Sequence, residues 1–246
     1  MKKHLPLYLL WIFTTLFSLQ VSCSDLGVEQ GGPAPIDDVV SLGVHPLKVG
    51  YYWHYKTVTL KEDSTEGNEF EQVKFEITRH SYNPQTPDEP MFHKVFVNPS
   101  TNTRSEYEWL YRNYVDGLYL MGGRMSTDSI DTNILLLKHP VSKGESWISP
   151  HLVYHLIDRE YQIPDSTVYT CVDTNAVFET PVGTFSCYVF YHRESLDDDV
   201  SAKADVFEYY SSEVGLVGVV TMSYFKDTQQ RIPKSKRILI STNVLN

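Results

Sequence analysis

The chain has 246 residues, of which 41% are hydrophobic and 13% aromatic, and its formal net charge at pH 7 is −10. This apolar content is sufficient for a packed core, which excludes a chain that is disordered throughout. The acidic balance, without a long basic stretch, excludes nucleic acid as a partner, because phosphates are bound by clustered lysines and arginines.

The N-terminus has the features of a lipoprotein signal peptide. Two lysines precede an apolar run over residues 5–19, and the small residue Ser22 comes directly before Cys23. We predict that residues 1–22 are removed and that Cys23 is acylated. The acyl chains would then hold the protein at the membrane of a bacterial cell envelope, on the periplasmic side of the outer membrane or at the cell surface. The alternative is an ordinary signal peptide, which would give a soluble exported protein.

The residues after Cys23 divide into a tether and a domain. Residues 23–38 contain several glycines and prolines and no apolar period, which predicts a flexible tether. From residue 39 to residue 246 the pattern has mostly a period of two, as over residues 73–78. We therefore expect a mainly β domain: antiparallel, built from curved or partly open barrel-like sheets, with little helix.

Two further segments bear on this assignment. Residues 106–112 alternate around Leu110, which is expected to be exposed, and Asp116-Gly117 then gives a hairpin signal. Residues 151–161 are the best helix candidate in the chain, although they could equally form another strand.

One pattern occurs twice. Residues 45–53 and 139–147 both read H-P-x-x-x-G-x-x-W, and weaker matches follow in the same order at a similar offset. The hypothesis is an internal repeat, with residues 37–130 and 131–246 forming two tandem β units. The alternative is chance similarity between two β segments.

Two cysteines remain once Cys23 is assigned to acylation. Residues 180–183 are predicted to form the turn between the strands that carry Cys171 and Cys187. A tight hairpin there places Cys187 opposite roughly position 177, on the order of 20 Å along the strand from Cys171. A disulfide requires Cα atoms within about 7 Å, so we expect two buried free thiols.

Three short segments resemble a known group of proteins. They are residues 46–55 (PLKVGYYWHY), 180–187 (TPVGTFSC) and 209–217 (YYSSEVGLV). Together they resemble uncharacterised bacterial cell-envelope lipoproteins of the domain-of-unknown-function type, which look related to the curved-sheet periplasmic lipoprotein carriers. The resemblance implies an envelope location and a curved antiparallel sheet, and it carries no catalytic residue.

No reaction or cofactor motif stands out. His151 and His155 are four residues apart but lack the H-E-x-x-H pattern of a zinc site, and Asp197 to Asp199 lack the spaced ligands of a calcium loop. The chain contains no G-x-S-x-G sequence. We therefore predict no catalytic residue, no metal and no cofactor.

Aromatic side chains are the remaining candidates for ligand contact. The predicted ligand-facing residues are Trp53, Tyr55, Trp109, Tyr111 and Tyr209. Such rings can line a concave surface that binds a sugar or an acyl chain. The alternative is that they fill the core of the β domain.

These observations favour a lipid-anchored envelope protein with a non-enzymatic role in binding or assembly. Its partners would be the membrane, through acylated Cys23, and an apolar or sugar ligand or an envelope protein. The alternative is a secreted glycan-acting hydrolase, whose two carboxylates the fold would bring together, or a carbohydrate-binding protein.

Overall fold

The computed structural model describes residues 43–83, 86–125, 129–150, 153–155, 160–162, 166–195, 202–225 and 230–245. The chain divides into two units, of which the first, Met1–Ala34, lies wholly outside the described residues. The predicted signal peptide, Cys23 and the tether therefore have no structural description.

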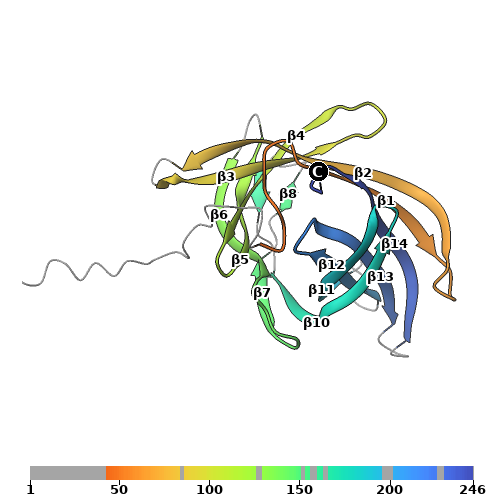
Figure 1. Ribbon diagram of the computed structural model, residues 1–246. Coiled ribbons are helices and arrows are strands. Elements are labelled where there is room, and N and C mark those ends of the chain that lie inside the picture. Colours follow the sequence, from red (N-terminus) through yellow and green to blue (C-terminus); the bar gives the residue numbers. More distant parts are fainter. Residues whose placement is uncertain are drawn as a thin grey trace, which may run out of the picture. The chain divides into compact units, whose positions relative to one another are not determined.

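In the described residues of the second unit all regular structure is β, which confirms the predicted mainly β fold class. The strands are β1 (Tyr52–Leu60), β2 (Glu66–Asn83), β3 (Thr86–Val97), β4 (Arg104–Tyr114), β5 (Gly117–Arg124), β6 (Ser129–Lys138), β7 (Ser146–Pro150), β8 (Val153–His155), β9 (Glu160–Gln162), β10 (Ser166–Thr180), β11 (Gly183–Ser195), β12 (Ala202–Ser211), β13 (Gly215–Phe225) and β14 (Gln230–Thr242). Twelve of them form one antiparallel sheet in the order β6-β5-β4-β3-β2-β1-β14-β13-β12-β11-β10-β7. The long neighbours β2 and β3 run side by side in Figure 1.

The sheet curls into a nearly closed barrel whose two edge strands, β6 and β7, are not paired with each other. Side chains bridge this seam instead. The indole Nε1 of Trp147 donates a hydrogen bond of 3.1 Å to the carbonyl oxygen of Leu136, and Lys138 forms an ion pair with Glu145. The seam is thus held beside the short connection between the two edge strands.

The sequence left helix and strand open for residues 151–161. In the described part of this segment β8 and β9 pair as a small antiparallel ladder, which is the strand alternative. Valine and tyrosine at positions 153, 154 and 161 favour extended backbone. The expectation that Leu110 is exposed was wrong: the residue is 1% exposed, so this face of β4 is also covered at that position.

The core is built around the aromatic residues that open β1. Trp53 donates a hydrogen bond of 2.6 Å from Nε1 to the carbonyl oxygen of Val214, and the Tyr55 hydroxyl donates one of 2.9 Å to that of Leu216. Both acceptors lie at the turn between β12 and β13 and the start of β13. These buried polar tips are therefore paired, which allows two large rings to lie in an otherwise apolar core.

The sheet consists of two meanders of six strands. One runs from β1 to β6, and the other comprises β7 and β10 to β14, with β8 and β9 as an excursion. Each H-P-x-x-x-G-x-x-W motif leads into the first strand of a meander, so that Trp53 and Trp147 are the second residues of β1 and β7. The hypothesis of an internal repeat stays a prediction, and this common order is compatible with it.

The two cysteines are free and buried, as expected. Cys187 lies opposite Ala176 in the β10–β11 ladder, whereas Cys171 lies opposite Phe190. Both thiol pKa values are raised, chiefly by burial, so neither sulfur resembles an activated thiolate. Separately, no helix among the described residues is long and apolar enough to cross a membrane.

Candidate functional site

A small cavity lies inside the curved sheet and is lined from both ends of the strand order. Its volume is about 160 Å³. The lining residues are His45, Lys94, Tyr111, Leu118, Leu136, Leu137, Tyr169, Glu208 and Tyr210. They come from the segment before β1 and from β3, β4, β5, β6, β10 and β12, so the closure of the sheet creates the cavity.

Lys94 on β3 supplies the positive charge of this cavity. Its Nζ lies 5.5, 4.9 and 5.2 Å from the ring centres of Trp53, Phe75 and Tyr111, which is cation–π distance. Nζ also lies 3.4 Å from Nε2 of His45. Burial lowers the pKa of Lys94 to about 8, although the Glu208 carboxylate opposes the shift. The group therefore remains largely an ammonium at neutral pH.

His45 is buried and stacks on Trp53, with ring centres 4.6 Å apart. Burial, followed by the charge of Lys94, lowers the pKa of His45 well below its usual value, so the imidazole is neutral. The Lys94 ammonium can only donate, which makes Nε2 the acceptor and places the ring proton on Nδ1. His45 thus orients the ammonium without adding charge.

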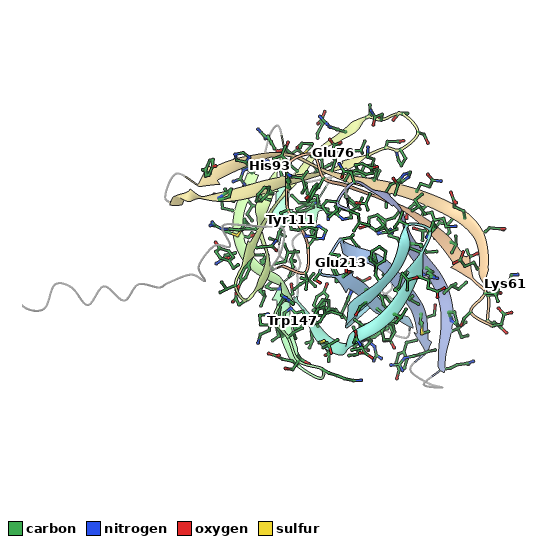
Figure 2. All side chains as sticks on the ribbon, in the orientation of Figure 1. Lys61, Glu76, His93, Tyr111, Trp147 and Glu213 are labelled. Atoms are coloured by element: carbon green, nitrogen blue, oxygen red, sulfur yellow. The ribbon has the colours of Figure 1, made fainter. Side chains whose placement is uncertain are left out.

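Glu208 on β12 supplies the negative charge. Its carboxylate raises the pKa values of Tyr111, Tyr169 and Tyr210, in each case as a contribution second to burial. The three phenols therefore stay protonated and can both donate and accept hydrogen bonds. Tyr111, on β4, is one of the residues labelled in Figure 2.

Glu208 also borders a second cavity of about 220 Å³. This cavity is lined by Thr57, Glu194, Val206, Glu208, Val219, Thr221, Ser235 and Arg237. Between the two glutamates, the buried His192 has its Nδ1 3.6 Å from Glu194 Oε1 and its Nε2 3.6 Å from Glu208 Oε1. Each cavity alone is below the roughly 300–1,000 Å³ of typical ligand pockets, but the two adjoin at one carboxylate.

The predicted aromatic residues are not all placed alike. Tyr111 lines the first cavity, and Trp53 lies beneath it as the ring against which His45 and Lys94 rest. Tyr55 is 1% exposed in the core. Trp109 is partly buried on β4, opposite Lys94 in the β3–β4 ladder. Tyr209 packs 4.5 Å from Phe178, and it points to the face of β12 opposite Glu208 because successive side chains alternate.

Sequence reasoning missed the charged residues of the site. Lys94 and Glu208 lie on strands with bulky apolar neighbours. A charged residue in the middle of such a strand is the sequence signal that could have indicated a buried site. No group of three or more His, Cys, Asp or Glu able to hold a metal ion occurs within the described ranges. His151 and Asp197 to Asp199 lie outside those ranges.

Comparison with known proteins gives one structural likeness. No protein-family model and no curated protein matches the sequence. A crystal structure described as a "putative lipoprotein from Parabacteroides distasonis" matches with a TM-score of 0.50 and 16% sequence identity, over 82% of this chain and 99% of that one. At this identity the likeness concerns the fold, and it supports the curved antiparallel sheet.

Proposed function

We propose that this protein is a lipid-anchored lipoprotein of the bacterial cell envelope that binds a small carbohydrate inside its curved sheet. The anchor rests on the N-terminal signal that ends at Cys23, and the description of the structurally similar protein points the same way. The single observation that carries the binding role is the presence of Lys94 and Glu208, two groups of opposite charge, in one cavity with three tyrosine rings.

The chemistry of the cavity favours a sugar over an acyl chain. An acyl chain would bury an ammonium, a carboxylate and three phenols against methylene groups, and each unpaired polar group would cost free energy. A sugar offers hydroxyl groups that can bond to all of these and an apolar ring face for the tyrosines. The site is suited to binding rather than to bond cleavage in this proposal, with Glu208 as the central acceptor.

Calorimetric titration of the full chain with a panel of mono- and disaccharides tests the proposal. A hydrogen bond to a charged group contributes about 1.5–3 kcal/mol, so Glu208→Gln should weaken sugar binding by about 10- to 100-fold. Glu213→Gln is the matched control, since Glu213 is exposed in the turn that follows the same strand.

The outcomes distinguish the candidate roles. Absence of sugar binding by the wild-type protein, or equal binding by Glu208→Gln, would exclude the carbohydrate site. Binding of laurate but of no sugar would favour the apolar ligand instead. Consumption of the sugar during the titration would favour the hydrolase, with Glu194 and Glu208 as its carboxylates, because both border the second cavity.

A further inference from the structure

A hydrogen-bonded chain of three side chains lies on the face of β2, β3 and β4 opposite the interior cavity. His93, labelled in Figure 2, is adjacent to Lys94 and therefore points to the other face of β3. The Ser81 Oγ lies 2.7 Å from Nε2 of His93, and Nδ1 of His93 lies 2.7 Å from Oε2 of Glu108. A nucleophile, a base and an orienting carboxylate in this order form the arrangement of a nucleophilic triad.

The hydrogen bonds determine the tautomer of His93. Burial opposes ionisation of Glu108, but hydrogen bonds from Arg79 and His93 outweigh it and lower the pKa of the carboxyl. An ionised carboxylate only accepts, so Nδ1 of His93 carries the proton and donates it to Glu108. Nε2 is then a lone pair that accepts the hydroxyl proton of Ser81. Burial lowers the pKa of His93 despite the opposing contribution of Glu108, which keeps the imidazole unprotonated at pH 7 and therefore able to accept a proton.

The three residues adjoin a cavity large enough for a substrate. Its volume is about 490 Å³, within the range of small-molecule sites, and both Ser81 and His93 line it. Met91, Met121 and Met125 contribute an apolar wall of flexible side chains.

Two guanidinium groups border the same cavity, and each is paired with a carboxylate. Arg124 donates hydrogen bonds to the carbonyl oxygens of Gly123 and Ile130 and forms an ion pair with Asp131, which also lines the cavity. Arg79 lines the cavity and donates from Nη2 to Glu108 at 2.7 Å, and 60% of its side chain is exposed. A guanidinium has five donors, so Arg79 can hold Glu108 and also bond to an oxyanion that forms beside Ser81.

We propose that Ser81 and His93 are the catalytic residues, and Glu108 a positioning residue, of a hydrolytic site for carboxylic esters with an apolar acyl chain. This activity goes beyond the ligand binding proposed for the interior and does not depend on it. Strand pairing alone assembles the three residues, so the site does not require the G-x-S-x-G sequence that places a nucleophile on a turn.

The reaction proceeds in two steps, acylation of Ser81 and hydrolysis of the acyl-serine. Ser81 Oγ forms a bond to the ester carbonyl carbon while its proton passes to Nε2 of His93, and Arg79 stabilises the resulting oxyanion. The carbon–oxygen bond to the alcohol then breaks, and His93 returns the proton to the departing alkoxide. Water next attacks the carbonyl carbon of the acyl-serine and gives a proton to His93. The bond from this carbon to Ser81 Oγ then breaks, His93 returns the proton to Ser81, and the carboxylic acid leaves.

A fluorophosphonate probe, which forms a bond only with activated serines, tests the proposal on the full-length chain. We expect one probe molecule per chain on the peptide that contains Ser81, and hydrolysis of p-nitrophenyl octanoate faster than of the acetate. His93→Gln should slow labelling by about 10²- to 10⁴-fold, the usual contribution of a general base. Ser212→Ala, at an exposed serine in the turn after β12, should label like the wild type.

The pH profile separates a triad from a merely structural hydrogen-bond chain. Glu108→Gln removes a group that raises the pKa of His93. The midpoint of the curve of labelling rate against pH should therefore shift to lower pH, and the rate itself should fall. An unlabelled wild-type protein, or labelling of Ser81 that His93→Gln leaves unchanged, would overturn the proposal. Both results are measured on proteins that retain Ser81. They therefore do not depend on whether a Ser81→Ala variant folds. A variant that loses labelling but still binds sugar, or one that loses sugar binding but is still labelled, shows that the two sites act independently.

Discussion

Lys94→Met should change how the stability of the protein depends on pH. The pKa of Lys94 is lowered to about 8 in the folded protein, chiefly by burial, from an ordinary value of 10.5. Between these two values the unfolded chain binds more protons than the folded one, so the free energy of unfolding rises with pH. The methionine variant lacks this titration, so the wild type should gain stability relative to it as the solution becomes alkaline.

The size of the effect follows from the two pKa values. One pKa unit corresponds to about 1.4 kcal/mol, so the full difference would be about 3 kcal/mol above pH 10.5. Integration between pH 7 and 9.5 gives about 2 kcal/mol. This interval lies below the titration of unfolded tyrosines near pH 10, which would otherwise reduce stability in both proteins.

Urea denaturation at half-unit pH steps from 7 to 9.5 measures the difference. Lys74→Met is the matched control. It removes an ammonium in the same way, but the Lys74 ammonium lies against one ring only, 4.8 Å from the centre of Tyr52. A wild-type-minus-variant difference that stays constant over this range would show that Lys94 is not desolvated in the folded protein. The description of Lys94 as a buried ammonium in the interior cavity would then be wrong.

Two further predictions concern the turn at Gly215 and the anchor. Gly215→Ala should lower the free energy of unfolding by more than about 2 kcal/mol, because φ is +82° and a Cβ would lie 2.2 Å from His45 Nδ1. Gly144→Ala, with φ of +87° and open space, should cost only the backbone strain of about 1–2 kcal/mol, so equal urea midpoints for the two variants would contradict the clash. Growth with a palmitate analogue should label the wild-type protein but not Cys23→Ser, and an unlabelled wild type would exclude the acyl anchor.

The architecture could be predicted because alternation and turn signals are local. The strand at residues 73–78 and the hairpin at Asp116-Gly117 both form, and Gly117, the first residue of β5, pairs with Tyr114, the last residue of β4. Leu110 shows the limit of this reasoning. An alternating pattern indicates two faces, but only tertiary packing decides whether the second face is covered.

The sites could not be predicted because they depend on pairing between distant strands. Lys94 and Glu208 line one cavity only after β1 has paired with β14, which joins the first strand of the domain to the last. Ser81, His93 and Glu108 meet because the registers of β2 with β3 and of β3 with β4 bring them to one face. No spacing in a single sequence specifies a register of this kind.

Strand β3 explains why polar chemistry is expected on both faces of the sheet. Met91 and Val95 are buried on the face of His93, whereas Lys94 lies on the other face among the rings of Trp53, Phe75 and Tyr111. A strand covered on both faces is ordinarily apolar throughout. A histidine and a lysine in its middle therefore cost desolvation energy that packing alone would have avoided.

The contacts of His93 and of Lys94 offset the cost of removing these groups from water to different degrees. His93 has a hydrogen-bond partner for each ring nitrogen, Ser81 and Glu108. Lys94 has aromatic rings and one imidazole nitrogen, and its lowered pKa shows that these contacts do not fully replace water. An incompletely solvated ammonium facing a cavity is a group that a ligand with hydroxyl oxygens would stabilise. The interior of the sheet is therefore the place where ligand binding should raise the stability of the protein most.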